Sequence, residues 1–228
     1  DDPAGTPQRF DFSYEHIVRS VEGSLRRLQT DYLDLLLLHR PDPLVEPTEV
    51  ARAFDALHAS GKVRYFGVSN HSPAQIALLQ ATVSQPLVVN QVQLSLLHPY
   101  LISEGIVANI AGKPAALASG TLDYCRLTGI LVQAWGPVDG GRLLNPPPDA
   151  VPHVKATAAS VAQMAAAKGV SPEAIALAWL LRHPAGIQPI IGTTQPARVQ
   201  ASVQADAVTL TREEWYALFV AARGERVP

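Results

Sequence analysis

The chain has 228 residues, 47% of them hydrophobic, so it can bury a sizeable core within one large α/β domain. A net charge of -2 offers no basic surface for nucleic acid and no cationic face for a membrane, and we expect neither partner. Because the single cysteine, Cys125, cannot form an internal disulfide and no charged and then apolar leader opens the chain, we expect a reducing, cytoplasmic setting.

Helices and short buried strands alternate in the first half of the chain. Ser13 precedes apolar residues at helical spacing, which predicts a helix that ends near Thr30. The next run, 35–38, is entirely leucine and stops at His39, which is typical of a parallel strand covered on both faces. The pattern then predicts a helix over 48–60, a strand over 63–68, a helix over 73–81 and a strand over 87–90.

The second half continues the alternation but contains two interruptions. Strands are predicted over 130–134 and 189–191, and helices over 156–168, 172–181 and 212–222. Thr211 and Glu214 form a capping box at the start of the last helix. The segments 101–120 and 139–153 are predicted to be loop inserts, and long loops of this kind commonly serve substrate or cofactor.

The alternation predicts right-handed βαβ units and a parallel sheet, either open and doubly wound or closed into a barrel. Candidate site residues stand at the carboxyl end of every predicted strand. A ring of loops around one site explains this better than a crevice at a single switch point. We therefore favour an α/β barrel of TIM type, forming a single domain over 1–228.

Short motifs mark these strand ends. In chain order they are 30–35 running into Leu38-His39, 61–64, 67–70, Asn90-Gln91, 134–137 with Gly140-Gly141, and 191–193 with Arg198. Together they resemble the aldo-keto reductase family, NAD(P)-dependent oxidoreductases built on a (β/α)8 barrel. The resemblance covers nearly the whole chain and is nearest to a bacterial branch with a Gly-rich insert before a helix, here at Leu122 to Cys125.

The resemblance implies that His39 is the catalytic histidine, which orients and polarises the carbonyl of an aldehyde or ketone. A neutral imidazole that donates a hydrogen bond to the carbonyl oxygen would stabilise the alkoxide formed on hydride transfer. The structural alternative is a histidine that only hydrogen-bonds a loop carbonyl. The remaining histidines show no metal-ligand spacing, and we predict no metal.

The family's cofactor positions are also matched. The resemblance assigns the nicotinamide carboxamide to Ser69, Asn70 and Gln91, whose hydroxyl and amide groups can hold an amide in one orientation. Ordinary turn chemistry is the alternative for these residues. Trp135 corresponds to the aromatic on which the nicotinamide stacks, with a core tryptophan as the alternative.

Phosphate contacts are implied at two further loops. Small residues there would let backbone amides approach the pyrophosphate, and they include Gly136, Pro137, Val138 and Gly141. At the last strand, Thr193 and Arg198 match positions around the adenosine 2'-phosphate. These two positions make NADP the expected cofactor. Gly192 stands where many members have a lysine, which leaves NAD as the alternative.

The catalytic set is expected to be incomplete. The chain holds about five of the eight strands, and the family's aspartate, its proton-donating tyrosine and its lysine would lie on three earlier strands that we expect to be missing. A non-catalytic nucleotide-binding sensor or regulatory subunit of the same family is therefore the alternative function. A barrel enzyme that binds sugar phosphates is a third. The expected partner is a small carbonyl compound, and the expected state is a monomer or a weak homo-oligomer.

Overall fold

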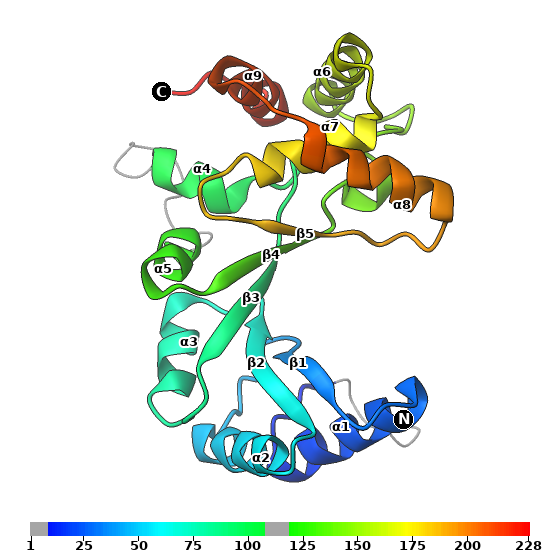
Figure 1. Ribbon diagram of the computed structural model, residues 1–228. Coiled ribbons are helices and arrows are strands. Elements are labelled where there is room, and N and C mark those ends of the chain that lie inside the picture. Colours follow the sequence, from blue (N-terminus) through cyan, green and yellow to red (C-terminus); the bar gives the residue numbers. More distant parts are fainter. Residues whose placement is uncertain (1–8, 108–118) are drawn as a thin grey trace. The chain divides into compact units, whose positions relative to one another are not determined.

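The computed structural model describes residues 9–107 and 119–228, which fall into two compact units, 1–90 and 91–228. The five strands of the described residues are hydrogen-bonded in chain order, β1-β2-β3-β4-β5 (Figure 1). The division into units falls within β3 (Leu87–Gln93). Strands that alternate with helices confirm the predicted α/β class, and five strands compare with eight in a full (β/α)8 barrel. A single domain over 1–228 stays a prediction.

Unit 1 is built from helices and parallel strands close to the predicted bounds. Its elements are α1 (Tyr14–Leu28), β1 (Leu33–Leu38), α2 (Pro47–Ala59), β2 (Val63–Ser69), α3 (Pro73–Gln80) and the start of β3. Ser13 caps α1, since its side chain accepts a hydrogen bond from the amide of His16. α1 and α2 lie side by side, and α2 packs on β2 (Figure 1).

The core of unit 1 places β1 and β2 in register. The two strands are parallel, with Leu38 opposite Val68, so the residues that follow them stand at adjacent strand ends. Phe54 of α2 stacks on Phe66 of β2 with ring centroids 4.0 Å apart, and both side chains are fully buried. This packing fixes the carboxyl ends of the two strands.

Unit 2 begins within β3 and carries the remaining elements. These are α4 (Tyr100–Val107), α5 (Thr121–Thr128), β4 (Leu131–Trp135), the 3-10 turn η1 (Asp139–Gly141), α6 (Pro152–Lys168), α7 (Pro172–Leu181), β5 (Gln188–Ile190), α8 (Pro196–Val203), the 3-10 turn η2 (Gln204–Ala207) and α9 (Arg212–Arg223). β4 and β5 are parallel, with Trp135 opposite Ile190.

The central helix of unit 2 is α7, which contacts α6, α8 and β5 (Figure 1). Its residues from Ala174 to Leu180 are all buried, which explains a helix with no polar face. Trp179 of α7 stacks on Trp215 of α9 at 5.1 Å, and each indole N–H donates to the other residue's carbonyl oxygen. Paired in this way, the fully buried Trp179 and the partly exposed Trp215 leave no indole donor unsatisfied.

Four segments differ from the sequence prediction. The predicted insert 139–153 contains η1, and α6 begins within it at Pro152, not at 156. The predicted insert 101–120 contains α4, and its residues 108–118 lie outside the described part of the chain. The strand predicted over 87–90 extends to Gln93, and α8 was not predicted. Cys125 is fully buried in α5. In the described residues no single helix is long and apolar enough to cross a membrane. The helices α6 and α7 would be long and apolar enough if taken together, but the chain bends by 98° between them.

Candidate coenzyme and catalytic site

A cavity of about 360 Å³ in unit 2 collects the predicted cofactor residues that follow β4 and β5. Trp135 stands at the end of β4 and Ile190 at the end of β5, so the cavity opens at the carboxyl ends of two paired strands. The lining residues that the sequence predicted are Trp135, Gly136, Pro137, Val138, Gly141, Gly192, Thr193 and Arg198. α7 and α8 supply the far wall with Glu173, Leu177 and Ser202.

The loop after β4 owes its path to backbone conformations that glycine adopts. Gly136, Gly140 and Gly141 have φ values of 65°, 63° and 93°, and Asp139 has 50°. A Cβ atom on any of these three glycines would meet no atom within 4 Å, so conformation and not space requires glycine there. The turn is closed by hydrogen bonds from the amide of Asp139 to Gly136 and from that of Gly141 to Val138.

The loop after β5 leads directly into α8. The Thr193 hydroxyl oxygen accepts a hydrogen bond from the amide of Gln195, at 3.2 Å, one residue before α8 begins. The hydroxyl donates to no acceptor among the described residues, so it can still donate to an anion. Arg198 is exposed on α8 and forms no ion pair within the described part of the chain. Hydroxyl and guanidinium donors therefore border the cavity on one side.

Gln91 does not line this cavity but belongs to a row of amides on three neighbouring strands. Its Nε2 donates to Oε1 of Gln133 on β4 at 3.0 Å, and Gln133 Nε2 donates to Oε1 of Gln188 on β5 at 2.8 Å. Gln133 and Trp135 are two residues apart on β4 and so point to the same face of the strand. We call Gln91, Gln133 and Gln188 the glutamine row. Sequence reasoning identified only its first member.

In unit 1 the predicted residues stand at the carboxyl ends of two paired strands. His39 follows β1 and is exposed, while Ser69 ends β2 directly after Val68, the partner of Leu38. Asn70 has a left-handed φ of 59°, and its Nδ2 donates to the Ser69 hydroxyl at 2.8 Å. The imidazole, hydroxyl and amide groups are thus at neighbouring strand ends, as the sequence predicted.

His71, which sequence reasoning set aside, braces this turn. It is buried, its Nδ1 donates to the carbonyl of Ser69 at 2.9 Å, and its own carbonyl accepts from Asn90 Nδ2 at 2.9 Å. Phe12 lies parallel to its ring at 6.3 Å. Burial lowers the pKa of His71, which keeps the ring neutral at physiological pH. Asn90 is fully buried, and its hydrogen bond to the His71 carbonyl satisfies its amide nitrogen. No local sequence signal marks the pair, because the two residues meet only in the folded chain.

The described part of the chain contains no group of three or more His, Cys, Asp or Glu side chains that could hold a metal ion. No tyrosine is the last residue of a described strand or the residue that follows it. The chemistry that the described strand ends offer is therefore hydrogen bonding by imidazole, hydroxyl and amide groups, together with an aromatic ring and a guanidinium beside a cavity.

Comparison with known proteins gives a consistent result. The profile of the Aldo/keto reductase family matches residues 4–219. The chain is 42% identical over 214 residues to Oxidoreductase YdhF of Escherichia coli, and 40% identical over 222 residues to a 6-dehydroglucose reductase of Novosphingobium aromaticivorans. These alignments cover 94% and 97% of this chain but 65% and 67% of the relatives, so the chain spans about two thirds of their length.

A solved structure agrees on the fold. A thermostable aldo-keto reductase crystallised with the inhibitor epalrestat superposes with a TM-score of 0.73 at 24% identity. The match covers 92% of this chain and 67% of that one.

Proposed function

Because this chain belongs to the aldo/keto reductase family, a family of oxidoreductases, we propose that it reduces aldehydes or ketones to alcohols with a nicotinamide coenzyme, NADP in preference to NAD. The observation that carries the proposal is the cavity at the ends of β4 and β5, whose lining combines an aromatic ring, a glycine-rich turn, a hydroxyl and a guanidinium. This combination suits a ligand with a flat ring at one end and phosphates at the other.

The cavity residues would divide the coenzyme between them. The Trp135 ring offers a face for the nicotinamide, and the glycine-rich turn lets backbone approach the pyrophosphate. Thr193 and Arg198 would donate to the 2'-phosphate. An acceptor on the Gln91 amide, and the hydroxyl and amide of Ser69 and Asn70, would hold the carboxamide. When bound, the coenzyme supplies the hydride.

His39 would act on the substrate. An exposed imidazole at the carboxyl end of β1 can donate a hydrogen bond to a carbonyl oxygen and so stabilise the negative charge that develops there. Two of the relatives are named 6-dehydroglucose reductase, which makes a sugar aldehyde a substrate class to test first. We also propose a cytoplasmic location and a monomeric or weakly homo-oligomeric state. Size-exclusion chromatography of the purified protein tests the oligomeric state.

The test uses coenzyme binding and turnover together. Thermal shifts are measured with NADPH, NADH and a sugar phosphate, followed by the rate of NADPH oxidation with an aromatic aldehyde and with 6-dehydroglucose. Stabilisation by NADPH with carbonyl-dependent oxidation supports the reductase. Stabilisation by NADPH without turnover on any carbonyl would favour the nucleotide-binding regulator, and stabilisation by the sugar phosphate alone would reject both.

A further inference from the structure

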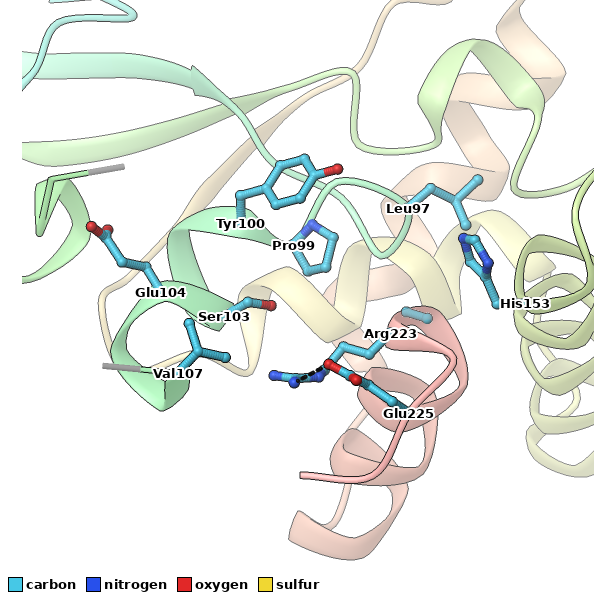
Figure 2. A pocket seen from close by; sticks show the side chains of 10 residues that line it. Leu97, Pro99, Tyr100, Ser103, Glu104, Val107, His153, Arg223 and Glu225 are labelled. Atoms are coloured by element: carbon cyan, nitrogen blue, oxygen red, sulfur yellow. Dashed lines mark hydrogen bonds and ion pairs between the residues drawn. The ribbon is translucent and has the colours of Figure 1, made fainter. Parts of the chain in front are cut away.

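A second cavity in unit 2, of about 370 Å³, shares no residue with the coenzyme cavity (Figure 2). It lies among the loop before α4, the helix α4 itself, the start of α6 and the end of α9. Figure 2 shows Arg223 and Glu225 on the α9 side, facing Ser103 and Val107 of α4. Its volume is within the range of pockets that hold small organic molecules.

Arg223 is the feature of this cavity that needs an explanation. Its side chain is only 6% exposed, and one guanidinium nitrogen, Nη2, donates to Glu225 at 2.9 Å. The other two nitrogens, Nε and Nη1, are buried and have no hydrogen-bond partner. Leaving buried donors of a charged group unpaired is costly, and native structures rarely do so without a ligand, water or ion. Arg223 therefore presents unused donors beside an open volume.

The charges around the cavity restrict what those donors can meet. Its lining contains one guanidinium and two carboxylates, those of Glu104 and Glu225. Glu104 accepts from the amide of Gly120 at 3.0 Å, and Glu225 is half exposed. An anion would pair with Arg223 but approach two carboxylates, while a cation would be repelled by the guanidinium. A neutral ligand with hydroxyl groups suits both the guanidinium and the carboxylates, because a hydroxyl can accept a hydrogen bond from the first and donate one to the second.

The rest of the lining is mostly apolar or aromatic, with Ser103 and His153 as its other polar side chains. Leu97, Pro99, Val107 and Ala222 give the cavity an apolar side, and the Tyr100 ring is 46% exposed. Tyr100 is held by His98, whose ring meets it edge-on at 4.5 Å. A ring whose carbon skeleton is apolar and whose rim is hydroxylated matches such a surface. We propose that this cavity binds a neutral polyhydroxylated molecule of monosaccharide size, oriented by Arg223, Glu104 and Glu225.

The proposal does not depend on the assignment of the coenzyme, so binding is measured without nucleotide. Isothermal titration of the purified protein with glucose and myo-inositol, beside gluconate and glucosamine, reads the charge preference directly. We expect saturable binding of the neutral compounds and much weaker binding of the anion and the cation. The proposal would be overturned if neither glucose nor myo-inositol showed saturable binding. It would also be overturned if gluconate or glucosamine bound more tightly than the neutral compounds.

Variants locate the binding. Arg223→Met keeps most of the side-chain volume but removes every donor, and it should weaken binding by at least about tenfold. Arg126→Met is the matched control, because Arg126 is half exposed on α5 and lines a different cavity. Ser103→Phe fills the cavity from α4 and provides a second test if the Arg223 variant does not fold. Unchanged affinity in a folded Arg223→Met or Ser103→Phe protein would refute the site.

Once the site is established, a sugar substrate can be distinguished from a separate ligand. If the cavity holds the remote end of the substrate, Arg223→Met should raise the KM for 6-dehydroglucose more than the KM for a small aromatic aldehyde. If the ligand is not a substrate, the two KM values should respond alike while glucose binding is still lost. Both results keep the binding site, since the titration alone decides it.

Discussion

Introducing a lysine at position 192 tests the phosphate end of the coenzyme cavity. Gly192 follows β5 in the cavity wall, and its φ is not left-handed. A Cβ atom built there would meet no atom within 4 Å, so Gly192→Lys introduces a flexible cation without steric cost. If Arg198 faces the 2'-phosphate, the new ammonium shares the same region of the cavity and should increase affinity for NADPH more than for NADH.

The size of the effect follows from the exposure of the site. Charge-assisted hydrogen bonds contribute about 1.5 to 3 kcal/mol, but both Gly192 and Arg198 are exposed and screened by salt. We therefore expect about 1 to 1.5 kcal/mol, which is about a five- to twelvefold lower Kd for NADPH. Arg198→Ala should raise the Kd for NADPH and leave the Kd for NADH nearly unchanged.

The assay is a fluorescence titration with each coenzyme at low and at high salt. Gly192→Gln, which is of similar length but uncharged, is the control and should leave the ratio of the two Kd values near that of the unaltered protein. The gain from lysine should shrink at high salt. Equal changes for NADPH and NADH both in Gly192→Lys and in Arg198→Ala would refute the position assigned to the 2'-phosphate.

Four further predictions concern single residues and pH. NADPH should quench tryptophan fluorescence, and Trp135→Phe should remove most of this quenching; if it persists there but disappears in a Trp215 variant, the stacking assignment is wrong. Gly67→Ala should lower the free energy of unfolding by about 1 to 3 kcal/mol in urea titrations, because its Cβ would lie 2.7 Å from the Val89 carbonyl oxygen and from Leu37 Cδ2. Gly105→Ala in α4, with no atom within 4 Å, is the control and should gain roughly 0.5 to 1 kcal/mol; equal effects would contradict the steric argument. Burial lowers the pKa of His71, so below its unfolded pKa of about 6.5 the unfolded chain binds a proton that the folded chain refuses. The urea midpoint of unfolding should therefore decrease as the pH is lowered from 7.5 to 5.5, and the decrease should be smaller in His71→Gln. The same decrease in both proteins would exclude His71 as a source of the pH dependence. Gln133→Leu should raise the Kd for NADPH while Gln133→Glu, which keeps the acceptor for Gln91, should retain most of the affinity; equal losses would show that the glutamine row does not act through that hydrogen bond.

The sequence predicts the strands and most helices well because their signals are local. The leucines at 35–38, the cap at Ser13, and the capping box of Thr211 and Glu214 all lie within a few residues of the element they define, and the structure has each of them. α4 and α8 are only eight residues long and have weaker signals. Their helical state depends on packing against partners distant in the sequence, as α8 packs on α7.

The site was predicted unevenly for the same reason. Residues next to strand ends, such as Trp135 and Thr193, could be assigned because the end of a buried run marks their position. Arg223 gave no such signal, since a basic residue in the last turn of a helix is ordinary surface chemistry until its burial is known. His71 was similarly hidden, because its partners at Ser69 and Asn90 are visible only once the turn after β2 is folded.

The glutamine row explains how the orientation of one side chain can be set by neighbouring strands. Each amide donates toward β5, from Gln91 to Gln133 and from Gln133 to Gln188. Reversing the Gln91 amide alone would place two carbonyl oxygens against each other, so the row must reverse together or not at all. The nitrogen of Gln91 is therefore committed to Gln133. An oxygen acceptor is the group needed to receive an N–H of a carboxamide. The glutamine row thus fixes which end of the Gln91 amide faces Gln133. Gln91 alone could present either its oxygen or its nitrogen.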